Sequence, residues 1–288
     1  MVSVTIALAQ LRVSDSKAAN FKRAREMVLE ASTRGAQIVV LPESFYAPMG
    51  GCDHISHAEF IDGEHLGEAA QVLSDTAKTA KVFLVGGTIY EKQTNADGTT
   101  TIFNTSTVWN PNGEMILKQR KLHPYAQYRA SKLTGELDVI TPGSSIGEFP
   151  TPWGKFGLAI CNDVRFPEPA MVAARHGCVG MIYTAAHPAG RWAGHWEMLL
   201  RARALDNLVF VAGCNPAMDR GARFVPCGRS MVLSPVAEAV AEAGEGEEVV
   251  VARVDLDLVD AARNEFPLDR QRRFDVYGDV AATAAATE

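Results

Sequence analysis

The sequence predicts a layered α/β fold. Short apolar runs typical of buried strands alternate with segments of helical periodicity in both halves of the chain. Two hairpin signals lie between the halves, each a turn-forming segment flanked by extended runs. No linker-like stretch divides the 288 residues. We therefore expect one continuous domain over residues 1–280, followed by a loose Ala/Thr-rich tail over residues 281–288.

The first half begins with an apolar strand and an amphipathic helix. Ser14 or Asp15 can cap this helix, and Gly35 is a plausible stop. Phe21 and Val28 share its apolar face. In order, the expected elements are a strand over 4–9, a helix to about residue 34, a strand over 37–41, a loop over 46–62, a helix over 66–80 and a strand over 82–87.

The middle of the chain carries the hairpins. Extended runs at 89–92 and 101–109 flank the turn Asn95-Ala96-Asp97-Gly98. A second turn at Pro111-Asn112-Gly113 leads into a strand that ends near Lys118. The stretch 121–145 is irregular, polar and long, which is typical of a functional loop.

The second half repeats the alternation of strands and helices. In order, we expect a strand over 157–161, a helix over 168–176, a strand over 179–183, a helix over 192–206, strands over 208–213 and 229–233, an exposed hairpin connection over 237–248, a strand over 249–254 and a short helix over 256–264.

Composition and charge exclude several classes of protein. The net charge of −6 gives no basic footprint for nucleic acid, and no apolar run reaches the roughly 18 residues of a membrane helix. The N-terminus is a poor signal peptide. The five cysteines are odd in number and widely spaced, so we expect reduced thiols in a cytoplasmic protein rather than a disulfide framework.

Cofactor and metal signals are weak. No glycine-rich nucleotide-binding motif occurs, so no nucleotide cofactor is expected. Cys52, Asp53, His54 and His57 have metal-ligand side chains, but no second cluster completes a four-ligand site. We therefore expect a plain surface or pocket loop at these residues and no metal.

A candidate nucleophile stands at the end of a buried strand. Cys161 follows the apolar run 156–160 and precedes a polar turn and a predicted helix. An α/β enzyme places a nucleophile in such a position. The alternative is an inert core thiol, because free cysteine is among the most buried residue types.

Two other strand ends carry reactive groups. Glu43 follows an apolar strand and a proline, where desolvation can suit a carboxylate to general-base work; a capping or salt-bridged glutamate is the alternative. Lys121 lies in a basic run with Lys118 and Arg120 that can be simply solvated. Strand alternation would turn Lys121 inward if Arg120 and Leu122 face the other way. A thiol, a carboxylate and an amine can together hydrolyse an amide.

These residues carry a resemblance to a known family. L-P-E at 41–43, R-K-L-H at 120–123 and C-N-D-V-R-F-P-E at 161–168 resemble the three motifs of the nitrilase (carbon–nitrogen hydrolase) superfamily, in the same order. The resemblance covers nearly the whole chain. It implies a catalytic triad of Glu43, Lys121 and Cys161.

The resemblance also implies architecture and a further acid. G-E-L-D-V-I-T-P-G at 135–143 is similar to the segment that carries an additional active-site glutamate, here Glu136. The family fold is a four-layer α-β-β-α sandwich, and its protomers usually pair through their helical faces. We therefore expect a homodimer or a higher homo-oligomer. Residues 195–207 resemble the helix that follows the nucleophile in omega-amidases, and His195 at its start can line the pocket.

Departures from the family pattern leave the substrate open. Asn162 stands where omega-amidases usually have tyrosine. The resulting C-N-D sequence at 161–163 resembles instead the hydrolases of N-carbamoyl-D-amino acids. The Trp-Glu pair usual in nitrile-cleaving members is absent. Arg165 can clamp a substrate carboxylate or form a salt bridge with Asp163 or Glu168.

The expected function is hydrolysis of a small carboxylate-bearing amide through a thioester on Cys161, with Asn162, Arg165 and His195 in contact with the substrate. An N-carbamoyl amino acid amidohydrolase is the main alternative. A second alternative is a binding protein that kept the fold but has no catalytic activity. A Cys–His hydrolase that uses His187 or His195 as its base is a further one.

Overall fold

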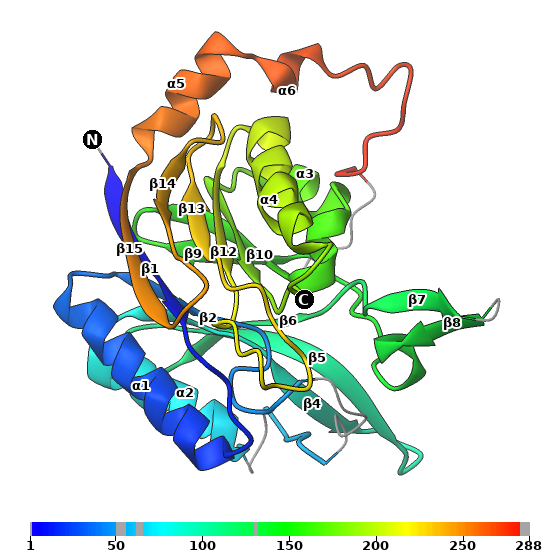
Figure 1. Ribbon diagram of the computed structural model, residues 1–288. Coiled ribbons are helices and arrows are strands. Elements are labelled where there is room, and N and C mark those ends of the chain that lie inside the picture. The colour runs from blue at the N-terminus through cyan, green and yellow to red at the C-terminus, as the bar shows by residue number, and fades with distance from the viewer. Residues whose placement is uncertain (1, 50–55, 62–65, 130–131, 283–288) are drawn as a thin grey trace.

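The computed structural model describes residues 2–49, 56–61, 66–129 and 132–282. Two β-sheets lie face to face, and each is covered by helices on its outer side (Figure 1). This is the four-layer α-β-β-α sandwich that the family resemblance implied. Among the described residues, no helix is long and apolar enough to cross a bilayer.

The first sheet is built mainly from the N-terminal half. Its strand order is β15-β1-β2-β3-β5-β4, with β6 paired to β5, and the central strands β1, β2 and β3 run parallel. Its elements are β1 (Ser3–Gln10), α1 (Lys17–Thr33), β2 (Ile38–Leu41), α2 (Glu68–Ala80), β3 (Phe83–Gly86), β4 (Ile89–Thr94), β5 (Thr100–Trp109), β6 (Met115–Arg120) and β15 (Glu248–Asp255).

The second sheet repeats the plan. Its order is β14-β13-β12-β11-β10-β9, and β10, β11 and β12 run parallel. Its elements are β9 (Gly147–Thr151), β10 (Gly154–Ile160), the 3-10 turn η2 (Cys161–Arg165), α3 (Glu168–Arg175), β11 (Gly180–Thr184), α4 (Ala193–Asn207), β12 (Phe210–Cys214), β13 (Met231–Leu233) and β14 (Ala239–Glu242). Helices α5 (Asp257–Glu265) and α6 (Leu268–Gln271) follow β15.

Three apolar clusters hold the layers together. One joins α1 and α2 to the first sheet, and another joins α3 and α4 to the second. The third lies between the sheets, where Ile6 and Val40 face Leu158 and Phe210. Burial of apolar side chains on both faces of the parallel strands explains why these strands read as nearly continuous apolar runs.

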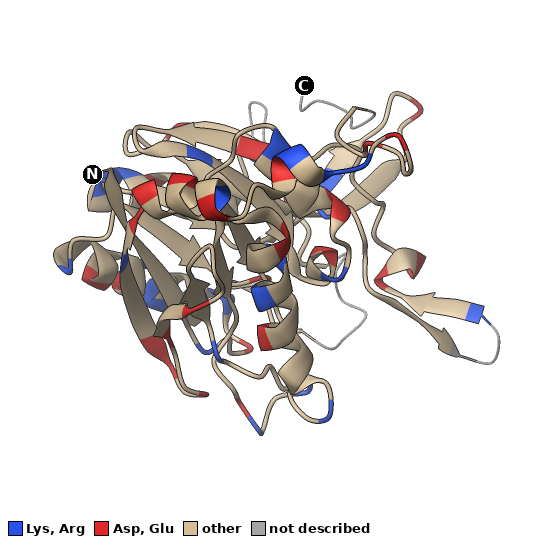
Figure 2. Ribbon diagram, turned by 90° about the horizontal axis from the view of Figure 1, so that it is seen from above, with Lys and Arg blue, Asp and Glu red and all other residues tan. Residues whose placement is uncertain are grey.

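Several sequence expectations need correction. The stretch 121–145 is not wholly irregular, because β7 (Ala126–Arg129), β8 (Lys132–Gly135) and the short turn η1 (Glu136–Asp138) lie within it. The β7–β8 hairpin projects from the body in both ribbon views (Figures 1 and 2). Its side chains are largely exposed, so no apolar periodicity marks it in the sequence.

Other corrections concern boundaries and connections. Ser16 caps α1 instead of Ser14 or Asp15, because Ser14 is held by the side chain of Asn20 at 2.8 Å. The segment 237–248 is not a simple hairpin connection: β14 pairs with β13 in one sheet, whereas β15 pairs with β1 in the other. The elements β9 and α6 were not predicted. Residues 283–288 of the predicted tail lie outside the described residues.

Candidate active site

Cys161 begins a sharp turn at the carboxyl end of β10. Its φ of 45° lies in the left-handed region, which costs a non-glycine residue about 1–3 kcal/mol. The turn directs the half-buried thiol toward the next strand end, where the Ala186 carbonyl oxygen lies 3.7 Å from Sγ. A strained residue at a strand end is typical of a functional position.

Glu43 lies just beyond the carboxyl end of β2 and is fully buried. Its Oε1 accepts hydrogen bonds from Lys121 Nζ and Asn104 Nδ2, both at 2.8 Å. Its Oε2 accepts from the Ala186 backbone N–H at 3.0 Å. Ala186 follows β11 of the second sheet, whereas Glu43 follows β2 of the first. Groups from both sheets therefore hold the Glu43 carboxylate.

Lys121 follows β6 and is only 1% exposed. Its ammonium lies 2.8 Å from Glu43 Oε1 and 2.7 Å from Glu136 Oε2. Burial alone would lower the pKa of Lys121, but the charges of Glu136 and Glu43 outweigh it and raise this pKa well above its usual value. The raised pKa favours the charged form of Lys121 in this cluster.

Glu136 closes the cluster from the base of the β7–β8 hairpin. Its Oε2 also accepts the Tyr125 backbone N–H at 2.6 Å, and its own N–H donates to the Tyr125 carbonyl at 2.8 Å. These bonds hold the carboxylate against Lys121. The arrangement suits a residue that orients the ammonium.

The pKa of the Cys161 thiol is raised well above its usual value. Burial is the largest cause, the Glu43 charge and a hydrogen bond with that carboxylate add to it, and Lys121 opposes it. The thiol is therefore protonated at neutral pH. A base is needed to generate the thiolate, and Glu43 stands beside it.

Asp163 ties the thiol turn to the lysine segment. This buried carboxylate accepts from the Ile160 N–H at 2.9 Å, the His123 N–H at 2.8 Å and the His123 ring Nδ1 at 2.9 Å. The His123 ring also stacks on Phe166 with centroids 3.7 Å apart. The positions of Cys161 and Lys121 are thereby fixed relative to one another.

The remaining sequence candidates, Asn162, Arg165 and His195, have different surroundings. The Asn162 side chain donates to the His123 carbonyl at 3.1 Å, so it is engaged with the segment that follows Lys121. Arg165 is exposed, and within the described ranges it forms no salt bridge with Asp163 or Glu168. His195, in the first turn of α4, packs against Trp192.

The histidine alternative has little geometric support. His187 Nε2 is 2.9 Å from the Trp192 carbonyl oxygen, and the ring stacks on Trp196. Burial lowers the pKa of His187, and the charges of Arg165 and His195 lower it further. The carboxylate of Glu43, and not this ring, is among the groups that shift the pKa of the thiol.

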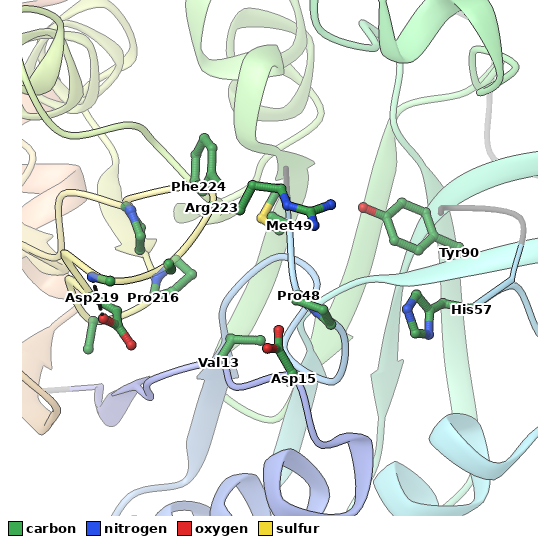
Figure 3. A pocket seen from close by; sticks show the side chains of 14 residues that line it. Val13, Asp15, Pro48, Met49, His57, Tyr90, Pro216, Asp219, Arg223 and Phe224 are labelled. Carbon is green, nitrogen blue, oxygen red and sulfur yellow. Dashed lines mark hydrogen bonds between the residues drawn. The ribbon is translucent and has the colours of Figure 1, made fainter. Parts of the chain in front are cut away.

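No cluster suited to a metal ion occurs among the described residues. Cys52, Asp53 and His54 of the suspected ligand loop lie outside them. His57 lines a cavity of about 460 Å³ beside the site, shown in Figure 3.

Sequence reasoning missed two groups that hold Glu43: the Asn104 side chain and the Ala186 backbone N–H. A signal for the first was present, because Asn104 starts the polar run N-T-S-T inside a strand that is buried over most of its length. Polar side chains in a buried strand need partners. The contact of the Ala186 backbone N–H with Glu43 could not be predicted, because the types of the side chains give no sign of it.

Known proteins resemble this chain along most of its length. A family model described as carbon–nitrogen hydrolase matches residues 5–264. Omega-amidase NIT2 of Danio rerio is 40% identical over 278 residues, which cover 96% of this chain and 97% of that protein. Omega-amidase NIT2 of Homo sapiens is 38% identical over 278 residues, covering 96% and 98%.

A solved structure is also similar. The crystal structure of Saccharomyces cerevisiae Nit3, a member of branch 10 of the nitrilase superfamily, superposes with a TM-score of 0.86 at 37% sequence identity. The match covers 94% of this chain and 97% of that chain.

Proposed function

This chain belongs to the carbon–nitrogen hydrolase family, and we propose that it is an omega-amidase-like enzyme that releases ammonia from a small carboxylate-bearing amide. A monoamide of a dicarboxylic or 2-oxo acid is the substrate class that fits best. We further propose that Cys161 is the nucleophile, Glu43 the general base, Lys121 the oxyanion partner and Glu136 the residue that orients Lys121.

One observation carries this proposal: a single buried ammonium, Lys121, bridges Glu43 and Glu136 at 2.8 and 2.7 Å. One positive charge is shared by two carboxylates. Glu43 can therefore take up a proton while Lys121 still pairs with Glu136. Such a cluster supports a proton acceptor and a fixed cation at the same time.

In the first half-reaction, Glu43 removes the Cys161 proton as sulfur attacks the amide carbon. The oxyanion that forms receives hydrogen bonds from Lys121 Nζ and the Asn162 backbone N–H. The carbon–nitrogen bond then breaks, and the proton held by Glu43 passes to the departing nitrogen. Ammonia and a thioester on Cys161 result.

In the second half-reaction, water gives a proton to Glu43 and attacks the thioester. The carbon–sulfur bond breaks, and the proton returns to sulfur. One water is consumed, and one ammonia and one carboxylic acid are formed. General-base assistance of this kind contributes roughly 10²–10⁴-fold to a rate.

Arg165 is the proposed carboxylate partner on the turn that carries the thiol. It lies four residues beyond Cys161 and is exposed, so its guanidinium can form two parallel hydrogen bonds with a carboxylate. His195, in the first turn of α4, is also proposed to line the site.

The test is ammonia release from a panel of small amides, nitriles and carbamoyl amino acids, with wild-type enzyme and Cys161→Ala. The variant should lose about 10⁴-fold or more of kcat/KM, because the covalent route disappears. Cys178→Ala is a matched control: this thiol is buried in the helix–sheet core, away from the site, and its loss should leave turnover within about twofold. Wild-type ammonia release by Cys161→Ala would refute the mechanism.

A second function is favoured by one feature, the C-N-D sequence at 161–163. Hydrolysis of an N-carbamoyl amino acid would release carbon dioxide together with ammonia, whereas hydrolysis of a carboxylic amide releases ammonia alone. Carbon dioxide measured in the same panel separates the two.

We also propose a homodimer that pairs through the helical layers, and a cytoplasmic location. Exposed apolar side chains on α4, including Met198 and Leu205, support the first. The cysteines that the structure describes are free thiols, which supports the second. Light scattering of the purified protein tests the dimer.

A further inference from the structure

The cavity of about 460 Å³ lies at the carboxyl ends of strands from both sheets. Residues after β1 and β2 form one side, and the loop 216–226 after β12 forms the other (Figure 3). Ligands of α/β proteins bind at this edge of a sheet. The volume falls within the range of about 300–1,000 Å³ that small-molecule sites occupy.

The cavity borders the reactive groups without including them. Ser44, next to Glu43, donates its hydroxyl hydrogen bond to Tyr90 at 2.9 Å, and Tyr90 lines the cavity. On the opposite side, Ala189 N–H donates to the Val225 carbonyl, and Cys227 N–H to the His187 carbonyl. Both walls are therefore direct continuations of the segments that hold Glu43 and face Cys161.

Apolar side chains stand on two sides of the cavity, while polar groups make up the larger share of its exposed lining. Val13, Pro48 and Met49 form one side, and Phe224 and Pro226 contribute the other. Methylene groups of a ligand gain free energy when they are buried against such surfaces. The methylene groups of an extended ligand can pack between these two apolar sides, and its polar end can face the polar part of the lining.

Arg223 provides the polar end. Among the described lining residues it is the only arginine or lysine, and Figure 3 shows its guanidinium directed across the cavity toward the side of Tyr90. No salt bridge of Arg223 occurs within the part of the chain that the structure describes. A guanidinium in this setting favours a carboxylate, which it can bind through two parallel hydrogen bonds.

Two acids also line the cavity. Asp219 is engaged in its own loop, where Oδ1 accepts the Gly221 N–H at 2.9 Å. Asp15 lies on the wall of Val13 and Pro48, away from Arg223 in Figure 3. A bound anion is therefore expected at the Arg223 end and disfavoured at the Asp15 end.

We propose that this cavity is an outer subsite for amides with a long apolar chain that ends in a carboxylate, and that Arg223 binds that carboxylate. The proposal rests on the amidohydrolase function above and names a longer substrate class for the same site. Arg165 stands on the turn of the thiol and suits a short substrate. Arg223 lies beyond the 186–189 segment, where it can bind the far end of a long substrate.

The test compares glutaric acid monoamide, sebacic acid monoamide and the methyl ester of the latter. Arg223→Gln should raise KM for sebacic acid monoamide by about tenfold or more, because a charge-assisted hydrogen bond is lost. KM for the short monoamide and for the methyl ester should stay within about twofold. Arg223→Lys, which keeps the charge without the planar fork, should fall between wild type and Arg223→Gln.

Two further variants distinguish the effect of the Arg223 charge on KM from an effect of altered packing in the loop 216–226. Arg220→Gln, an exposed arginine of the same loop that pairs with Glu245 and does not line this cavity, should change none of the three KM values. Asp15→Asn should lower KM for sebacic acid monoamide, opposite in sign to Arg223→Gln. A change of the same sign in both variants would overturn the assignment, as would an equal effect of Arg223→Gln on the short monoamide.

The outcomes also distinguish this inference from the function on which it rests. If wild-type protein releases ammonia from no amide, the amidohydrolase proposal fails. If it hydrolyses glutaric acid monoamide but not the sebacic acid monoamide, or if Arg223→Gln leaves their ratio unchanged, only the outer subsite is refuted. Thermal melting of each variant verifies that it is folded.

Discussion

Two buried glutamates, Glu91 in β4 and Glu43 just after β2, are paired with cations in opposite ways. Glu91 is contacted by two cations, Arg120 at 2.7 Å and Lys118 at 3.1 Å. Glu43 instead shares the single ammonium of Lys121 with Glu136. Arg120 and Lys121 are consecutive residues, and strand alternation directs one to each cluster.

The difference separates a structural cluster from a reactive one. Burial alone would raise the pKa of Glu91, but hydrogen bonds from Arg120 and Thr105 and the nearby positive charges outweigh it, so this pKa is lowered. Glu91 stays ionised and fixes the strands. At Glu43 one cation faces two carboxylates, so a proton can be accepted without leaving a cation unpaired. A buried pair of opposite charges therefore does not by itself indicate catalysis.

The largest expected difference comes from replacing each glutamate by its amide. Glu43→Gln cannot accept the thiol proton, so kcat should fall about 10²–10⁴-fold. Glu91→Gln should keep kcat within about twofold and instead lose about 1–3 kcal/mol of unfolding free energy, because a charge-assisted hydrogen bond becomes neutral. Steady-state ammonia release and urea unfolding measure the two effects. Equal losses of kcat in both variants would contradict the distinction between the clusters.

The neighbouring cations give the next largest contrast. Lys121→Met removes the oxyanion partner, and kcat should fall about 10²–10³-fold. Arg120→Met should leave kcat nearly unchanged, because Lys118 still faces Glu91 and the thiol site is on the other side of the strand. Kinetics of both variants under identical conditions provide the check. If Arg120→Met were as inactive as Lys121→Met, alternation would not separate the two clusters.

The smallest effect is a dependence of stability on pH. Because the folded pKa of Glu91 is lowered, its ionised form stabilises the fold above the unfolded value of about 4.3. This contribution is lost as pH falls through the folded pKa. Glu91→Gln should therefore lose less stability than wild type between neutral pH and about pH 3. Urea midpoints across this range measure the slope, and identical slopes would show that Glu91 is not the group responsible.

Much of the fold was predictable because strands and helices here carry strong local signals. The apolar runs before Glu43 and Cys161 are buried on both faces, and both residues lie at the strand ends where they were expected. The β7–β8 hairpin was not predicted, because exposed strands lack a buried face and hence an alternating pattern. Strand β14 was missed for the same reason.

The site was predictable only in part. The family motifs are short and contiguous in the sequence. They were enough to predict four candidate residues: Glu43, Lys121, Glu136 and Cys161. Asp163 was considered only as a salt-bridge partner of Arg165, whereas it binds His123 and the Ile160 N–H instead. That choice depends on which segment packs against the turn, which no local pattern encodes.

By itself, the amino-acid sequence determined the layered α/β class, the family and the identity of the candidate reactive groups. The fold class follows from hydrophobic periodicity, whereas the family and the reactive groups follow from the resemblance of three short segments to the motifs of that family. Only the tertiary structure decided that one ammonium bridges two carboxylates, that Ala186 from the other sheet holds Glu43, and that Arg223 faces a cavity beside them. The hydrogen-bonded pairs among these residues lie from 15 to more than 140 positions apart in the chain. Strand pairing within the first sheet brings Lys121 to Glu43, and packing of the second sheet against the first brings Ala186 to Glu43.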